Sequence, residues 1–246
     1  MIKRGKTLGT GPLVTLYITT KEWTMGNYVF FEARLKSGTT IEVDWGDGQT
    51  SMLAPLDTCL SRVDHFYKER GSEMYYIINF YSEDRNSLLE LYNGVCEVHV
   101  EAAYFIHCYS LAKLRIPYVE GPFFDSLGIW ACCSLEELNI DYFNGEMLIT
   151  TFGMSMPRLK KLQCNGSDYL EEIDLRGCNE VETLVCRSCH RLKKIILSNN
   201  SKLRSVDFDG TALYKYSMKF ISKIIEKNTK RSNTAKSIGS GCNFRK

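Results

Sequence analysis

The amino-acid sequence predicts a mainly β protein, with an N-terminal β-sandwich, a β-solenoid after it and a capping helix near the C-terminus. Short alternating runs separated by turn residues fill residues 10–80, which is typical of a sandwich. An apolar pattern then recurs every 22–24 residues, a period that stacked coils show. Residues 214–228 place apolar side chains and lysines at helical spacing. We therefore expect three parts, at 1–83, 84–213 and 214–246.

Composition and charge exclude several classes of protein. The chain has 246 residues, of which 44% are hydrophobic and 24% charged, as in a globular protein. A net charge of +2 argues against nucleic acid as a partner, and no apolar run is long enough for a transmembrane segment. No apolar segment follows the basic residues at the start, so no signal peptide is expected. The expected location is cytoplasmic by default, with a virion or a cell surface as alternatives.

Four strands are expected in the first part, and a tight turn follows the third. β-branched and aromatic residues form strand-like runs in four segments, residues 13–19, 28–35, 39–43 and 75–80. The third segment leads into Asp44-Trp45-Gly46-Asp47-Gly48. Asp-Gly after a strand favours a hairpin, because the turn needs a positive φ that glycine adopts easily.

The same region resembles a known family. Val43-Asp44-Trp45-Gly46-Asp47-Gly48 is followed by His65-Phe66-Tyr67, by Gly71 and by the alternating strand Tyr75-Tyr76-Ile77. This series resembles the polycystic-kidney-disease (PKD)-type immunoglobulin-like domain over residues 10–83. Segment 51–62 departs from the family pattern, since it is richer in leucine and methionine. The resemblance implies a non-catalytic spacer or adhesion module.

Asp44 and Asp47 have two interpretations. Paired carboxylates on a tight loop suit a hard cation, so the two residues are candidate calcium ligands. Aspartates in turns also accept hydrogen bonds from nearby backbone N–H groups, and this structural role is the favoured one. His65 is likewise interpreted as a packed structural residue before a ligand or a base.

The pattern apolar-x-x-apolar-x-apolar recurs through the second part. Its first series starts at intervals of 24, 24, 22 and 22 residues and comprises Leu111/Leu114/Ile116, Leu135/Leu138/Ile140, Leu159/Leu162/Cys164, Val181/Leu184/Cys186 and Leu203/Val206/Phe208. A second series lies between these and comprises Val100/Ala103/Phe105, Phe124/Leu127/Ile129, Ile149/Phe152/Met154, Leu170/Ile173/Leu175 and Leu192/Ile195/Leu197. The two series predict about five coils, each with an extended segment on two sides. One coil cannot bury its inward side chains alone, whereas stacked coils make a continuous apolar column.

The motif also resembles a repeat family. Phe105-x-x-Cys108-x-Ser110-Leu111-x-x-Leu114-x-Ile116 is followed by Trp130-x-Cys132-x-Ser134-Leu135-x-x-Leu138-x-Ile140. This resembles the BspA-type (Treponema-type) leucine-rich repeat, and the later coils resemble bacterial surface-protein leucine-rich repeats. The resemblance covers about 98–213. It implies the fold and, more loosely, a role in adhesion or host interaction.

The cysteines fall into the repeat register, which explains them without a metal. Alternatives remain for one group. Cys186-Arg187-Ser188-Cys189-His190 has the C-x-x-C-H spacing of a c-type haem attachment. Another alternative is a zinc site, because cysteine and histidine are usual zinc ligands and are present at Cys178, Cys186, Cys189 and His190. Cys164 and Cys186 are expected to stack on neighbouring coils, where a disulfide is geometrically conceivable.

Exposed positions of the repeats are the candidate partner surface. Glu136-Glu137 is expected beside Lys160-Lys161, and Glu171-Glu172 beside Lys193-Lys194, so that opposite charges face each other on neighbouring coils. The positions between the second and third apolar residues form one stripe, Arg115, Asn139, Gln163, Val185 and Asp207. This stripe is mixed in character and poor in aromatic residues.

The third part is basic. Residues 214–246 hold nine basic residues and one acid, a net charge of +8, which leaves −6 for residues 1–213. The predicted helix places Met218, Ile221, Ile224 and Ile225 in one apolar stripe and repeats lysine at every fourth position, Lys215, Lys219, Lys223 and Lys227. A cap that closes the solenoid is the favoured interpretation, and a basic surface for a membrane, a phosphate or an acidic protein is the alternative.

The sequence favours no enzyme, since it contains no nucleophile elbow, phosphate-binding loop, H-E-x-x-H motif or dinucleotide fingerprint. The leading hypothesis is a non-catalytic interaction protein that binds a protein or a glycan through the repeat surface. One alternative is a structural subunit of a larger assembly, such as a phage virion or fibre, that docks through residues 214–246. Another is a cysteine-rich metal-binding protein. No cofactor is expected.

Overall fold

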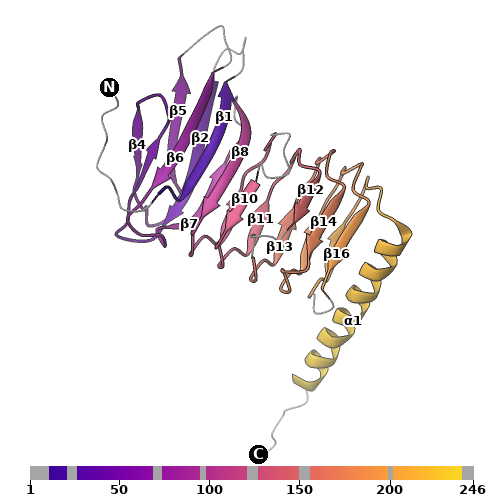
Figure 1. The fold of residues 1–246 in the computed structure, drawn as a ribbon. Coiled ribbons are helices and arrows are strands. Elements are labelled where there is room, and N and C mark those ends of the chain that lie inside the picture. The colour runs from indigo at the N-terminus through magenta and orange to yellow at the C-terminus, as the bar shows by residue number, and fades with distance from the viewer. Residues whose placement is uncertain are drawn as a thin grey trace, which may run out of the picture.

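The computed structural model describes residues 11–20, 27–68, 74–94, 98–120, 127–149, 156–198 and 202–239. They form a mainly β structure with one helix (Figure 1). The first eight strands are β1 (Val14–Thr20), β2 (Asn27–Leu35), β3 (Ile41–Asp44), β4 (Thr50–Leu53), β5 (Ser61–Tyr67), β6 (Tyr75–Tyr81), β7 (Leu88–Asn93) and β8 (Val98–Ile106). The others are β9 (Lys113–Arg115), β10 (Leu127–Trp130), β11 (Glu137–Asn139), β12 (Met147–Ile149), β13 (Lys161–Gln163), β14 (Glu172–Leu175), β15 (Thr183–Val185), β16 (Lys194–Leu197) and β17 (Ser205–Asp207).

Two sheets face each other at the N-terminal end. β1, β6, β3 and β4 are antiparallel neighbours in one sheet, and β5, β2 and β7 are neighbours in the other. The ring of Phe31 in β2 lies 5.0 Å from that of Phe80 in β6 and 6.1 Å from that of Trp45. The four expected strands are present. β4 and β5 were not among the expected strands, and both overlap segment 51–62, which the sequence indicated as a connection.

The hairpin predicted after β3 is confirmed. β3 pairs with β4, and the turn places Gly46 and Gly48 at φ values of 82° and 90°. The Asp44 carboxylate accepts a hydrogen bond of 2.9 Å from the backbone N–H of Gly46. Asp47 accepts one of 3.0 Å from the N–H of Gln49. Both aspartates therefore hold the turn, as aspartates in such turns often do.

The solenoid is present and has about four turns. β9, β11, β13, β15 and β17 pair in parallel, and Leu114, Leu138, Leu162, Leu184 and Val206 stand opposite one another in that ladder. The sequence predicted about five coils. The difference arises at β8, which was counted as the first half-coil. It is nine residues long and pairs antiparallel with β1, so it also completes the sandwich.

One register in the second series was wrong. The sequence aligned Phe152 with Ile173, whereas the structure pairs Leu148 in β12 with Ile173 in β14. Phe152 and Met154 lie outside the described residues. Residues 147–154 are rich in apolar side chains, so two registers satisfy the repeat pattern equally well. The pairing of β14 with β16 agrees with the prediction, because Ile173 stands opposite Ile195.

The two sheets of the sandwich continue into the two sides of the solenoid. β7 pairs antiparallel with β2 and parallel with β9, and β8 pairs antiparallel with β1 and parallel with β10. Both sheets therefore cross the expected boundary at 83/84. The buried apolar residues form one core cluster from Leu13 to Ile224. Arg85 adds a polar link, since its guanidinium donates to the carbonyl oxygens of Gly11, Pro12 and Ile106.

The coils turn at positions with positive φ. At one corner such residues recur in successive coils, at Tyr118, Tyr142, Gly166, Ser188 and Gly210, and His107 and Ala131 have positive φ at another corner. The N–H of each of the first four donates to a carbonyl oxygen of the next coil. The ring of Tyr142 stacks on Tyr118 at 4.6 Å and lies where a side chain on Gly166 would stand. Because the Tyr142 ring occupies this space, the third coil has glycine at position 166.

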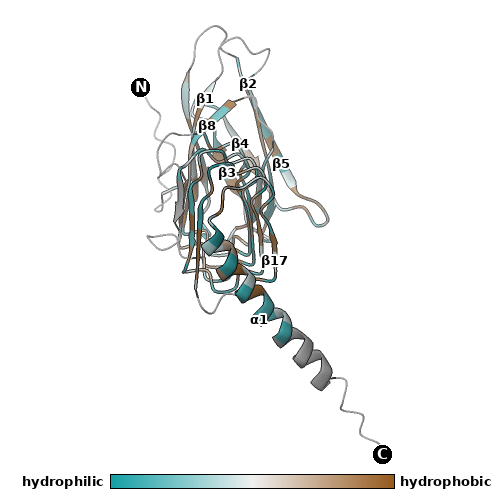
Figure 2. Ribbon diagram, turned by 90° about the vertical axis from the view of Figure 1, so that its right-hand side faces the viewer, coloured by the Kyte–Doolittle hydropathy of each residue, from teal (hydrophilic) through white to brown (hydrophobic). Residues whose placement is uncertain are grey.

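A helix closes the last coils. The expected helix over 214–228 is confirmed and is longer, because α1 spans Lys215–Gly239. Ile221 and Ile224 are buried, whereas Met218, predicted in the same apolar stripe, is 40% exposed. The Asn228 side chain donates to the carbonyl oxygen of Leu203. Figures 1 and 2 show that the rest of α1 projects beyond the solenoid. Within the described residues, no helix is long and apolar enough to span a bilayer.

Candidate interaction surfaces

The outer face of the eight-stranded sheet carries the predicted stripe. Strand pairing places Arg115, Asn139, Gln163, Val185 and Asp207 side by side, as the sequence predicted. Tyr92 of β7 precedes them in the same row. Eight strands at about 4.8 Å spacing make this face about 34 Å long. In Figure 2, β5 and β17 lie on this side and β1 and β8 on the other.

A shallow hollow of about 120 Å³ lies over the first coils of this face. Its lining comes from Tyr92, Lys113, Leu114, Arg115, Glu137, Leu138, Asn139, Lys161 and Gln163. Lys113 lies 3.9 Å from Glu90 and 3.7 Å from Glu137, so its charge is shared between two carboxylates. Arg115 and Lys161 are exposed, and neither makes an ion pair within the described part of the chain. The hollow is therefore net basic and open to an anionic group.

Hydrogen bonds fix the amides of the stripe. The carboxamide oxygen of Asn139 accepts from the N–H of Asp141 at 3.0 Å. The Gln163 amide donates to the Asp141 carboxylate at 2.8 Å, and that carboxylate also accepts from the N–H of Asn165 at 2.7 Å. At the far end, the Arg187 guanidinium lies 2.6 Å from Asp207 and lowers the pKa of its carboxyl. The stripe consequently presents ordered polar groups.

Opposite charges stand beside one another on neighbouring coils. Lys160 and Glu136 are 2.8 Å apart, and Glu137 stands opposite Lys161. On the other side of the solenoid, Glu171 pairs with Lys193 and Glu172 with Lys194, at 3.1 and 2.9 Å. These pairs are confirmed. The three ion pairs among them are accessible to solvent, so each adds little to stability, and Glu137 and Lys161 are strand neighbours without an ion pair between them.

The outer face of the other sheet holds aromatic residues that the sequence analysis did not single out. Tyr17, Tyr104 and Trp130 lie on β1, β8 and β10, with ring centroids 5.9 and 5.5 Å apart. Ile77 stands opposite Tyr17 and is 44% exposed. The available signal was the alternation of aromatic residues with buried ones in these strands. Aromatic residues on a surface are enriched in protein interfaces.

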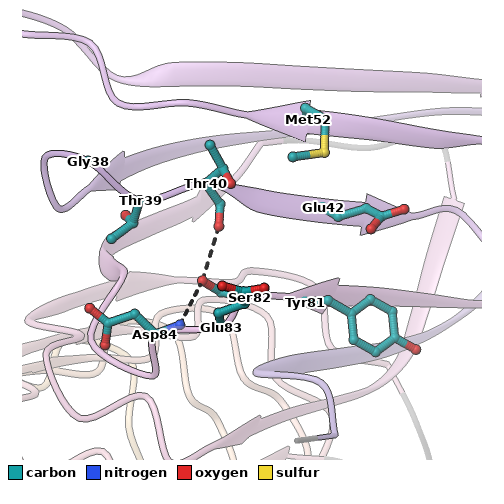
Figure 3. A pocket seen from close by; sticks show the side chains of 9 residues that line it. All are labelled: Gly38, Thr39, Thr40, Glu42, Met52, Tyr81, Ser82, Glu83 and Asp84. Atoms are coloured by element: carbon teal, nitrogen blue, oxygen red, sulfur yellow. Dashed lines mark hydrogen bonds between the residues drawn. The ribbon is translucent and has the colours of Figure 1, made fainter. Parts of the chain in front are cut away.

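A groove opens between β3, β4 and the end of β6 (Figure 3). It holds about 340 Å³ and is lined by Gly38, Thr39, Thr40, Glu42, Met52, Tyr81, Ser82, Glu83 and Asp84. The Ser82 hydroxyl donates to the carbonyl oxygen of Thr40 at 3.0 Å and accepts from the N–H of Asp84. Burial raises the pKa of Tyr81, and the nearby Asp44 and Glu42 raise it further. The groove is acidic.

Lys36 forms an ion pair with one carboxylate of this groove, that of Asp84. It lies 2.9 Å from Asp84 and, with Asn86, lowers the pKa of that carboxyl from 3.8 to about 2. Because the folded-state pKa is depressed, the stabilisation is present above pH 3.8 and is lost as the pH falls toward 2. Replacing Lys36 with alanine is expected to raise the pKa of Asp84, measured by NMR titration. An unchanged pKa, as expected for Lys68→Ala, would contradict this assignment.

The four lysines of α1 lie on its exposed surface. Lys215, Lys219, Lys223 and Lys227 make no ion pair within the described residues. Tyr216, which is 77% exposed, lines a hollow of about 190 Å³ with Ser217, Phe220 and the four residues of β16. The helix therefore combines free positive charge with exposed apolar surface.

The calcium candidates serve the turn between β3 and β4. The Asp47 carboxylate lies 2.8 Å from the His65 ring and also accepts from the Gln49 side chain. His65 stacks on Trp45 with ring centroids 5.0 Å apart, which agrees with its interpretation as a packed residue. Within the described ranges, no cluster of three or more potential metal-binding side chains occurs.

The zinc candidates are separated by the coil. Cys186 and Cys189 are buried, and the Cys189 thiol donates to the carbonyl oxygen of Cys164 at 2.9 Å. His190 is exposed and lies 2.7 Å from Asp168. Cys178 is buried at another corner. The four side chains are not brought together.

Cys164 and Cys186 stack as predicted, with sulfur atoms 3.1 Å apart, and both are free thiols. The Cys186 thiol and burial raise the pKa of Cys164. A protonated, buried thiol reacts slowly. Among the eight described cysteines, we expect iodoacetamide to modify only Cys59 and Cys133 in the folded protein, since these two are exposed. Mass spectrometry of labelled peptides checks this, and rapid labelling of Cys164 would contradict it.

Comparison of the chain with protein-family models, with curated proteins and with solved structures found no match.

Proposed function

We propose that this chain is a non-catalytic binding protein whose partner, a protein or a glycan, lies along the outer face of the eight-stranded sheet. The observation that carries the proposal is the basic hollow beside Arg115. In this hollow, the unpaired cations of Arg115 and Lys161 lie beside ordered amide side chains, those of Asn139 and Gln163. Because hydrogen bonds already order these amide side chains, binding a partner costs less side-chain conformational entropy. The PKD-type and BspA-type resemblances of the sequence favour the same class of function.

Binding to a glycan array and to a panel of acidic proteins tests this proposal. Arg115→Glu reverses a charge at the centre of the hollow and is expected to reduce binding at least tenfold. Arg158→Glu is the matched control, because Arg158 is also exposed and does not line the hollow. A ligand that binds both variants equally well, or the absence of any ligand, would argue against this face.

A second candidate function is a structural subunit that assembles through its basic C-terminal segment. The observation that favours it is the projection of α1 beyond the solenoid with its lysines unpaired (Figure 1). Residues 230–239 of the helix are mostly polar in sequence, and a helical segment that is polar on all sides gains little from packing on the rest of the chain. Light scattering of the whole chain and of a chain ending at Thr229 tests this function. The shorter chain retains Ile221, Ile224, Asn228 and the four lysines from Lys215 to Lys227. Loss of oligomers would therefore assign the contact to residues 230–246, whereas oligomers that persist in the shorter chain would assign it to residues 215–229; a wild-type chain that is monomeric would contradict this function.

A further inference from the structure

The C-terminal segment is strongly basic, whereas the strands of the first part have an excess of acidic residues. Residues 27–94 hold eleven acidic and six basic residues, a net charge of −5 that residues 1–26 reduce to −2 for residues 1–94, and residues 214–246 carry +8. Figure 1 shows that the strands of the first segment and α1 lie at opposite ends. Two copies placed end to end would therefore bring opposite charges together.

The groove of Figure 3 has the chemistry of a lysine site. Glu42 in β3 stands between Met52 of β4 and Tyr81 of β6 in the strand register. Its carboxylate has no partner within the described residues, and the same is true of exposed Glu83. Met52 is 59% exposed. A lysine side chain lays its methylene stem on apolar surface and directs its ammonium group to a charged partner.

The exposed side of α1 presents matching groups. Its lysines recur at every fourth residue, so Lys219 and Lys223 lie on one face about 6 Å apart along the axis. Met218 and Tyr216 are exposed beside them. The groove thus offers two free carboxylates and a thioether, and the helix offers two free ammonium groups and apolar side chains.

From this complementarity we propose that α1 of one copy docks in the acidic groove of a second copy, with Lys219 and Lys223 directed at Glu42 and Glu83. The proposal rests on the second candidate function. Because the groove and the helix lie at opposite ends, the contact is heterologous and leaves a free groove and a free helix on every dimer. Such a contact continues into a filament or closes into a ring.

Light scattering of the full chain tests the contact. We expect oligomers at an ionic strength of about 0.01 M, where the Debye length is about 30 Å, and monomers at about 1 M, where it is about 3 Å. Glu42→Lys with Glu83→Lys reverses the groove, and Lys219→Glu with Lys223→Glu reverses the helix. Each double variant alone is expected to be monomeric, and an equimolar mixture of the two is expected to associate. Glu146→Lys with Asp209→Lys is the matched control, because both carboxylates are exposed on the solenoid.

Each outcome decides between the contact and the function on which it rests. Oligomers that survive groove reversal but disappear in the chain ending at Thr229 would overturn the groove and retain the assembly function. A wild-type chain that is monomeric at low ionic strength would overturn both. Loss of oligomers in the control variant would show a dependence on total charge and would also overturn the groove. Circular dichroism of each variant checks that the fold is intact.

Discussion

Replacing Gly46 with alanine is expected to destabilise the protein by about 3 kcal/mol or more. Gly46 has a φ of 82°, which an L side chain rarely adopts, and an added Cβ would lie 2.7 Å from the carbonyl oxygen of Ile77. The same atom would lie 2.9 Å from the backbone nitrogen of Ile77. These neighbours are backbone atoms of β6, so they cannot move without breaking the sheet. Urea denaturation followed by circular dichroism measures the effect.

Gly48→Ala is the control for this substitution. Gly48 has a similar φ of 90°, but nothing lies within 4 Å of the position of an added Cβ. The control therefore carries only the backbone strain, about 1–2 kcal/mol. Equal losses for the two variants would show that the close approach of Gly46 to β6 has no energetic consequence.

Leu91→Ala is expected to cost about 2–5 kcal/mol and to weaken both ends of the molecule together. Leu91 in β7 is buried and stands opposite Ala33 of the sandwich and Leu114 of the solenoid. The cavity would therefore lie where the two parts share a sheet. The measurement is amide hydrogen exchange at increasing urea concentration, followed in peptides from β2 and β13.

The contrasting variant is Leu197→Ala at the other end. Leu197 is buried in β16, and in stacked coils each unit contacts only its neighbours. Its effect is expected in the last coils, with little loss of protection in β2. If β2 and β13 lose protection in separate transitions in wild-type protein, the sandwich and the solenoid are independent units despite their shared sheets.

The sequence allowed the stacking of the first series to be predicted because every coil needs an apolar residue at each inward position. That requirement placed Leu138 beside Leu162 and Cys164 beside Cys186 correctly. It was not sufficient at β12, where several apolar residues compete for the same position. Nor did it predict the positive φ of Tyr118 and Tyr142, since backbone hydrogen bonds between coils sustain a conformation that tyrosine alone does not favour.

The surfaces were predictable to different degrees. The stripe from Arg115 to Asp207 follows from the repeat period alone, because equivalent positions of successive coils are neighbours. The groove was not predictable in this way. Glu42 and Tyr81 are far apart in the sequence and meet only because β3 pairs with β6. The pairing of β1 with β8, such as Val14 opposite Phe105, is equally long-range and has no periodic signature.

The coil also acts as a unit of length. A further coil of 22–24 residues would extend the solenoid by about 4.8 Å, whereas 22 extended residues would span about 75 Å. Each coil of the solenoid thus adds only a short length to the molecule, but that length is rigidly defined. Duplication or deletion of a coil would therefore change the separation between the acidic groove and the basic helix α1 by a fixed increment of one strand spacing. Neither the groove nor the helix would need to change.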